Sequence, residues 1–195
     1  MRPRLKGIFV LHSEARLVFA ETAYATMFFM RFFAVLVLTA ALLGSVSAGD
    51  GNDDAFRTGL SAFNSGKYAS ALAAWRPLAE RGDPRAQESV GYLYYSGRGV
   101  PRDTRQAAAY FYRAADQGEP TAQLFLAYMH FNSIGVPQNS PLAMMWAELA
   151  MDGGLFEAYD LRGSVMESMT DAERAEGWRL LDQWRAIHAR TARTR

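Results

Sequence analysis

The sequence repeats itself with a step of 36 residues. This step separates the alanines Ala86, Ala122 and Ala158, and the tripeptide Gly-Val-Pro recurs at 99–101 and 135–137. A fixed period of roughly 20 to 50 residues is typical of a solenoid, in which similar units stack on one another. Each unit contacts only its neighbours, and the stack presents a long surface. The period therefore favours a binding surface over an enclosed catalytic pocket.

One unit, over residues 85–120, predicts two helices joined by a loop. Residues 86–95 place apolar side chains at helical spacing. A glycine-rich loop that ends in Pro101 stops this helix, because proline cannot continue it. Asp103 then begins the second helix as an N-cap residue, and Gly118 ends it. Each unit is thus expected to be a helical hairpin.

The same plan extends in both directions from this unit. Residues 121–154 repeat it, residues 54–84 give a shorter version without the glycine-rich loop, and residues 155–190 give a degenerate version. In the last unit, Thr170 and Glu173 have the spacing of a capping box at a helix start. We therefore expect about four helix pairs.

Small and aromatic residues predict how these helices pack. Gly91 lies inside a predicted helix, where glycine costs about 1 kcal/mol relative to alanine, so it indicates a neighbouring helix at very short distance. One period later stands Ala127, which is also small. The tryptophans lie on packing faces of second helices, which we expect to be buried: Trp75, Trp146, Trp178 and Trp184. The last helix also carries Leu181 and Ile187.

These features together resemble the Sel1-like repeat, a relative of the tetratricopeptide repeat. The unit at 85–120 follows the family's pattern at Ala86, Val90, Gly91, Tyr94, Gly97, Gly99, Val100, Asp103, Ala107, Tyr110, Ala114, Ala115 and Gly118. The next unit is looser, with other residues at four of the family's positions: Ala127, His130, Ser133 and Asn139. The resemblance implies an all-α, right-handed α-α solenoid of about four helix pairs over residues 54–190.

The beginning of the chain predicts export. Residues 32–48 form an apolar run without charge, preceded by Arg31 and ended by the small residues Val46-Ser47-Ala48. This order is typical of a secretory signal peptide, and the run is shorter than the roughly 20 apolar residues of a membrane-spanning helix. We expect cleavage near Ala48, followed by a short polar linker over 49–53. The alternative is an uncleaved anchor that tethers the protein to a membrane.

Residues 1–29 do not fit a signal peptide, because they form a long mixed leader with two glutamates. Met27 and Met30 both stand just before the apolar run. This arrangement favours a translation start at Met27 or Met30 over Met1. Residues 1–48 are therefore assigned to the leader and the signal peptide, outside the repeat domain.

Composition narrows the classes of partner. After Ala48 the chain has sixteen Lys/Arg and eighteen Asp/Glu residues, and 16 − 18 gives a net charge near −2. This balance disfavours nonspecific binding to nucleic acid, which needs a basic surface. The basic residues at 191–195 are expected to form a solvated tail. The chain has no cysteine, so disulfides and thiol chemistry are excluded.

We find no sequence motif for catalysis, for a cofactor or for a metal. The chain lacks the G-x-S-x-G and S-x-x-K nucleophile motifs, and Gly97-x-Gly99 lacks the remaining residues of a phosphate-binding loop. The histidines His12, His130 and His188 are far apart in sequence. His130 stands at a tyrosine position of the family and is expected to be structural. We therefore expect no catalytic residue, no cofactor and no metal.

In related repeats, first-helix residues outside the packing pattern face the inner, concave surface. The resemblance therefore implies a partner-binding face made of Gln87, Tyr92, Tyr95, Gln123, Tyr128 and Phe131. The pairs Tyr92/Tyr128 and Tyr95/Phe131 are one period apart, so we expect them to stack into an aromatic ladder. Aromatic side chains among polar ones suit a binding groove. The alternative is that these side chains cover the seams between repeats.

The sequence thus predicts an exported bacterial adaptor without catalytic activity, either periplasmic or secreted. It would bind a protein or peptide partner through the concave face. The competing hypothesis is a cell-wall or β-lactam hydrolase, because some exported relatives have been linked to that chemistry. Those relatives are rich in cysteine, so the absence of cysteine and of S-x-x-K disfavours it here. Dimerisation through Trp178 and Trp184 stays an open alternative.

Overall fold

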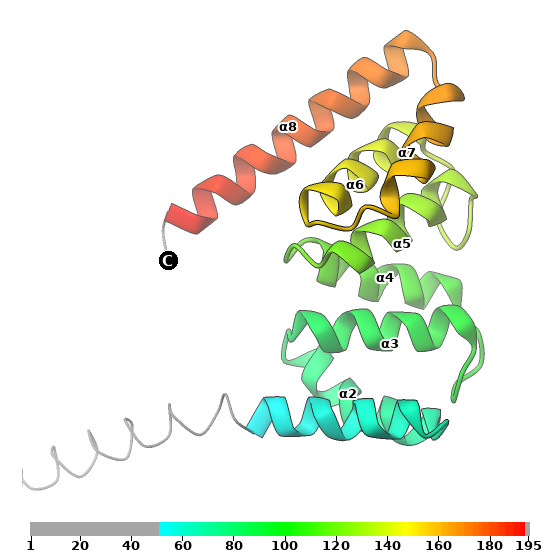
Figure 1. The fold of residues 1–195 in the computed structure, drawn as a ribbon, viewed down its shortest axis with the longest axis vertical. Coiled ribbons are helices and arrows are strands. Elements are labelled where there is room, and N and C mark those ends of the chain that lie inside the picture. Colours follow the sequence, from blue (N-terminus) through cyan, green and yellow to red (C-terminus); the bar gives the residue numbers. More distant parts are fainter. Residues whose placement is uncertain (1–50, 194–195) are drawn as a thin grey trace, which may run out of the picture. The chain divides into compact units, whose positions relative to one another are not determined.

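The computed structural model describes residues 51–193, which form helices joined by short turns and loops (Figure 1). A helix over 51–64 is followed by α2 (Tyr68–Glu80), α3 (Pro84–Ser96), α4 (Thr104–Ala115), α5 (Pro120–Phe131), α6 (Ser140–Asp152), α7 (Ala158–Glu167) and α8 (Asp171–Arg193). The prediction of an all-α array of four helix pairs is confirmed.

The predicted leader, start positions and signal peptide, over 1–48, lie outside the described residues. Residues 51–53, which the sequence assigned to a linker, are already helical, and α8 continues to Arg193, into the predicted tail. None of the helices between residues 51 and 193 combines the length and apolarity needed to cross a membrane.

Side-chain caps fix where the helices begin. The carboxylate of Asp103 accepts hydrogen bonds from the backbone N–H groups of Arg105 and Gln106, which confirms it as the N-cap of α4. The hydroxyl of Thr170 accepts from the N–H of Glu173, and the Glu173 carboxylate accepts from the N–H of Thr170. This reciprocal pair is the predicted capping box before α8.

The two helices of a pair approach most closely at small residues. A Cβ atom on Gly91 would lie 2.9 Å from the ring of Phe111, so α3 and α4 can pack this closely only with glycine at that position. The close approach predicted at Gly91 is therefore confirmed. One period later, Ala127 and Ala147 occupy the two positions, and both are fully buried. The larger first-helix residue is thus matched by a smaller second-helix residue.

Loops join each pair to the one before it. Gly99, in the loop after α3, lies against the backbone of Tyr68 and Ala69 at the start of α2. Gly135, in the loop after α5, lies in the same way against the backbone of Thr104 at the start of α4. Both glycines have positive φ, 72° and 71°, and a side chain would meet backbone atoms at less than 3 Å. The period is therefore kept by contacts between neighbouring units.

The last helix pair is splayed, because α8 packs mainly on α6 (Figure 1). Gly177 lets α8 approach Met144 of α6, Leu181 is fully buried, and Trp184 contacts Trp146 with 6.5 Å between ring centroids. Burial of Trp75 and Trp146 confirms two of the predicted core positions.

The predicted burial of Trp178 is wrong, since this side chain is 39% exposed, and Ile187 of the same helix is 60% exposed. The physical reason lies in the contact with α6, which takes place through the face of α8 that carries Gly177 and Leu181. Trp178 stands one residue beyond Gly177 and so points about 100° away from that face.

Candidate partner-binding face

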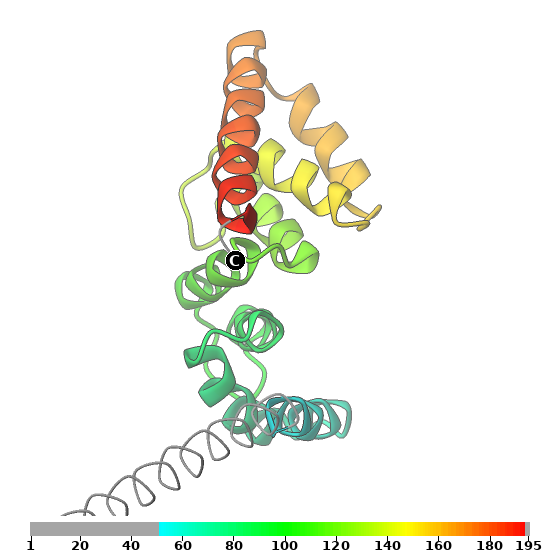
Figure 2. The same ribbon diagram turned by 90° about the vertical axis from the view of Figure 1, so that its left-hand side faces the viewer.

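The first helices of successive pairs open onto one side of the array. Turning the view by 90° places helix 51–64, α5 and α7 toward one side and α4 and α8 toward the other (Figure 2). We call the open side the first-helix face. Its positions in α3 and α5 are one period apart and follow i, i+4, i+7 spacing: Glu88, Tyr92 and Tyr95, then Leu124, Tyr128 and Phe131.

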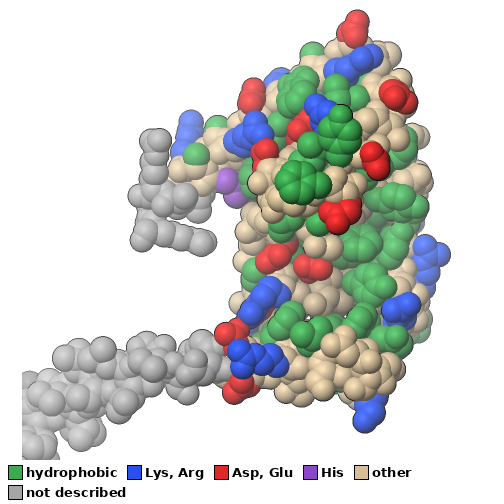
Figure 3. Space-filling view, in the orientation of Figure 1, with side chains coloured by type: hydrophobic (Ala, Val, Ile, Leu, Met, Phe, Trp, Pro, Cys, Tyr) green, Lys and Arg blue, Asp and Glu red, His purple; other side chains and the backbone are tan. Residues whose placement is uncertain are grey.

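An aromatic groove of about 480 Å³ lies on this face. Its lining comes from the end of α3, from α5 and from the start of α7: Tyr95, Leu124, Phe125, Tyr128, Glu157 and Leu161. Figure 3 looks onto this face and shows apolar side chains gathered across its middle, with charged side chains around them. Tyr128 is 42% exposed, so the groove offers uncovered aromatic surface.

Gln87 and Gln123 do not belong to the accessible surface, which corrects the predicted binding set. They are 3% and 2% exposed. The side-chain amide of Gln87 donates to the carbonyl of Ala79 at 3.1 Å, and that of Gln123 donates to the carbonyl of Ala115 at 3.1 Å. Each glutamine therefore satisfies a carbonyl group at the end of the preceding second helix, where helical hydrogen bonds run out.

The two glutamine contacts differ in one respect. The Oε1 atom of Gln87 accepts a hydrogen bond from Gln117 at 2.8 Å, whereas Oε1 of Gln123 is buried with no such partner among the described residues. The residue one period after Gln117 is Gly153, which has no side chain to donate. The seam before α5 is thus less well satisfied than the seam before α3.

The aromatic ladder passes through Phe125 instead of joining residues one period apart. Ring centroids of Tyr92 and Tyr95 lie 6.0 Å and 5.3 Å from that of Phe125. Phe125 in turn stacks on Phe111 at 4.6 Å. The predicted direct pairing of Tyr92 with Tyr128 is therefore replaced by a diagonal arrangement.

Phe131 belongs to a different environment from the other aromatic residues of the ladder. It packs against the smaller apolar cluster of Ala143, Met144, Val165 and Met169. Its predicted pairing with Tyr95 is replaced by the contact of Tyr95 with Phe125. The four aromatic residues of the predicted set thus divide into seam and surface: Tyr92 and Phe131 mainly pack, and Tyr95 and Tyr128 line the groove. Their binding of a partner stays a prediction.

Acidic and basic side chains lie at opposite ends of the first helices. Glu88 near the start of α3, Glu119 before α5 and Glu157 before α7 place three carboxylates toward the N-terminal ends. Beyond the other end of α3, Arg98 lies over Tyr92 at 5.8 Å and Arg102 over Tyr95 at 5.9 Å. The groove thus runs between an acidic edge and a basic edge.

Burial perturbs two titratable groups of this face. Desolvation, reinforced by the charge of Glu119, raises the pKa of Glu88 to about 7. Burial also raises the pKa of the Tyr95 hydroxyl, helped by nearby Tyr128 and opposed by Arg102. Because two carboxylates repel one another in a desolvated site, the pair Glu88 and Glu119 favours a nearby positive charge.

His130 has a structural environment, as the sequence predicted. It is 4% exposed, one ring nitrogen lies 3.1 Å from the carbonyl of Pro137, and the other is bonded to the hydroxyl of Tyr112. Burial lowers its pKa, so the neutral imidazole is favoured. Between residues 51 and 193, no three His, Asp or Glu side chains are grouped as metal ligands.

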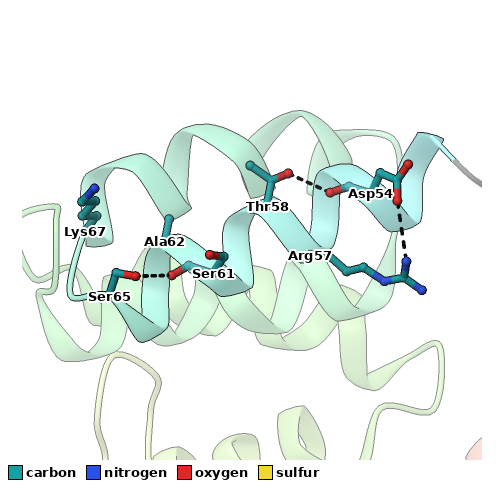
Figure 4. A pocket seen from close by; sticks show the side chains of 7 residues that line it. All are labelled: Asp54, Arg57, Thr58, Ser61, Ala62, Ser65 and Lys67. Atoms are coloured by element: carbon teal, nitrogen blue, oxygen red, sulfur yellow. Dashed lines mark hydrogen bonds and ion pairs between the residues drawn. The ribbon is translucent and has the colours of Figure 1, made fainter.

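A second hollow, of about 580 Å³, lies along the outer side of helix 51–64 (Figure 4). It is shallow and its lining is polar or small, from Asp54, Arg57, Thr58, Ser61, Ala62, Ser65 and Lys67. Thr58 and Ser65 bond to backbone carbonyls of their own helix, and Arg57 pairs with Asp54. These four side chains are therefore engaged within their own helix.

Sequence reasoning missed several residues that line the groove or its acidic edge. Glu88 and Leu124 lie one helical turn before Tyr92 and Tyr128, so the same i, i+4 spacing would have found them. Phe125 and Leu161 are themselves 36 residues apart, which is a repeat signal. Nothing in the sequence distinguished Glu157 from the many other carboxylates expected at the surface.

Comparison with known protein families identifies the 36-residue repeat. The Sel1 repeat pattern matches residues 84–119 and 120–155, two consecutive units with the boundaries of α3–α4 and α5–α6. This chain therefore contains two consecutive Sel1 repeats, over residues 84–155. Sel1 repeats typically mediate protein–protein interactions and usually serve as non-catalytic scaffolds. No curated protein matches the sequence of this one.

Two solved structures share this Sel1-like architecture. The first is the crystal structure of c5321, a protective antigen present in uropathogenic Escherichia coli strains, with a TM-score of 0.65 and 26% identity over 71% of this chain. The second is a Sel1 repeat protein from Oxalobacter formigenes, with a TM-score of 0.55 and 22% identity over 65% of this chain. This chain spans 31% and 55% of their respective lengths.

Proposed function

We propose that this Sel1 repeat protein is an exported adaptor that holds a segment of a protein partner in the aromatic groove without catalysing a reaction. The observation that carries the proposal is the groove itself, which leaves the Tyr128 ring 42% exposed beside Tyr95, Phe125 and Leu161. Aromatic and aliphatic side chains in a concave patch are the usual anchors of protein interfaces.

Export is the second part of the proposal and rests on the apolar run at 32–48. The mature chain would begin near residue 49 and act in the periplasm or outside the cell. Intact mass of the exported protein tests this part. A mass that starts near residue 49 is expected, whereas retention of residues 32–48 would favour a membrane-tethered scaffold.

Site-specific crosslinking tests the groove. A photoreactive phenylalanine analogue at position 128 is expected to capture one discrete partner in cells. The matched control is the same analogue at position 178, because Trp178 has a similar exposed fraction, 39% against 42% for Tyr128, and lies on α8. Partner bands from position 178 alone would contradict the proposal, as would the absence of a band from both positions.

A further inference from the structure

The carboxylates along the acidic edge of the groove lack internal partners. Among the described residues, no ion pair or hydrogen bond engages the side chains of Glu88, Glu119 or Glu157. Glu157 lines the groove directly. Glu88 is only partly exposed, so water compensates its charge less than it would at an open surface.

The arginines closest in sequence to this edge are already engaged. Arg85, one turn before Glu88, binds the carboxylates of Asp53 at 2.8 Å and Asp83 at 2.9 Å. Arg113 donates to the carbonyl of Ala79 at 2.7 Å and lies over the ring of Tyr110. Neither arginine is therefore free to compensate Glu88 and Glu119.

We infer that the partner segment places a bulky apolar side chain in the aromatic groove and a lysine or arginine against Glu88 and Glu119. This inference rests on the proposed function and specifies the chemistry of its partner. Tyr95 follows Glu88 by seven residues on the same helix, which gives roughly 10 Å along the axis at 1.5 Å per residue. An extended peptide covers that distance in about three residues, so the basic residue stands about three positions from the apolar anchor.

Charge complementarity supports this occupant over others. A segment rich in Asp or Glu would meet three uncompensated carboxylates and be repelled. A purely apolar segment would fill the groove and leave the repulsion between Glu88 and Glu119 unchanged. A basic residue beside an apolar anchor relieves that repulsion and covers the groove at the same time.

The test is a selection of random twelve-residue peptides, displayed on phage, against the purified full-length protein. We expect enriched peptides to carry Lys or Arg about three positions from an aromatic or large aliphatic residue. Their affinity should fall about tenfold for the variant Glu88→Gln/Glu119→Gln. It should stay within about twofold for the control Glu80→Gln/Asp182→Asn, which neutralises exposed carboxylates elsewhere. A Lys→Gln change in the peptide should cause a similar loss in the parent and little further loss in the double variant.

The outcomes separate the inference from the proposed function. Enrichment of acidic peptides, or binding that ignores both the protein and the peptide charge changes, would overturn the inference and leave the groove as a docking site. Peptides that bind equally well to the Tyr128→Ser variant would place their site elsewhere and contradict both. Failure to enrich any peptide would also contradict both.

Discussion

At the scale of single residues, the contact between Gly91 and Phe111 decides how closely α3 and α4 approach. Phe111 is fully buried and stacks on Phe125 at 4.6 Å, so its ring has no room to move away. In the next unit, Ala127 is tolerated because Ala147 stands where Phe111 would be. The two positions thus vary together, so that a smaller side chain at one allows a larger side chain at the other.

The variant Gly91→Ala is expected to be less stable than the parent by up to about 2 kcal/mol. Alanine gains about 1 kcal/mol in helix propensity, but overpacking at a fixed ring costs about 1–3 kcal/mol. The control is Gly163→Ala in α7, where an added Cβ meets nothing within 4 Å, and a gain of about 0.5–1 kcal/mol is expected. Urea unfolding followed by circular dichroism measures both; equal effects at the two sites would contradict the steric reading.

Glu88 makes stability depend on pH. Its pKa is about 7 in the folded protein against 4.5 for an ordinary glutamate, so the folded state binds more protons than the unfolded state between these pH values. Stability therefore falls as pH rises through this window. At pH 8, Glu88→Gln should be more stable than the parent by about 1–2 kcal/mol, allowing for partial exposure.

At pH 4 the two proteins should be nearly equal in stability, because the carboxyl group is largely protonated in both states there. Thermal unfolding from pH 4 to pH 8 provides the measurement, with Glu80→Gln as the exposed control. If the difference between Glu88→Gln and the parent stayed constant with pH, burial would not be raising the pKa of Glu88.

At the scale of elements, the loops after α3 and α5 act as contacts between units as well as connections. Gly135 and Gly118 both have positive φ, 71° and 92°. Only Gly135 faces a neighbour, since its Cβ would lie 2.4 Å from the carbonyl oxygen of Thr104, while Gly118 faces open space. A substitution at Gly118 therefore introduces backbone strain alone, whereas one at Gly135 adds a steric clash to that strain.

We expect Gly118→Ala to cost about 1–2 kcal/mol, the usual penalty for a left-handed alanine. Gly135→Ala should cost a further 1–3 kcal/mol or so, because the loop must move away from α4. Chemical denaturation of both variants gives the comparison. A loss no larger at Gly135 than at Gly118 would show that the loop contact with α4 contributes little.

The helix α8 shows where a sequence pattern is ambiguous. Trp178, Leu181, Trp184 and Ile187 recur every three residues, so their side chains drift around the helix by about 60° per step. The buried face runs instead through Gly177, Leu181 and Trp184. Glycine carries no hydrophobic signal, although it is the residue that admits Met144 of α6. Periodicity alone could not identify the buried face of α8, because that face depends on which helix α8 packs against.

At the scale of the whole molecule, the period of the sequence was enough to predict the number of helix pairs, although the first described helix starts at residue 51 and the last continues to Arg193, beyond the predicted ends of the repeat domain. It could not separate seam from surface within a first helix. Gln87 and Glu88 are adjacent and equally polar, but Gln87 is 3% exposed and bonds to Ala79, while Glu88 lies on the first-helix face. Successive side chains point about 100° apart around a helix. A small error in the predicted helical phase therefore exchanges a buried position for a surface position.

The same repeated contacts bear on how such a chain changes length over generations. The same hydrogen bond joins Gln87 to Ala79 and Gln123 to Ala115, one period apart. The loop contacts at Gly99 and Gly135 are repeated in the same way. An in-frame duplication of residues 84–119 would supply each copy with a matching neighbour on both sides. The gene can therefore lengthen or shorten the groove in 36-residue steps without inventing a new core, and recognition can diversify while folding stays conserved.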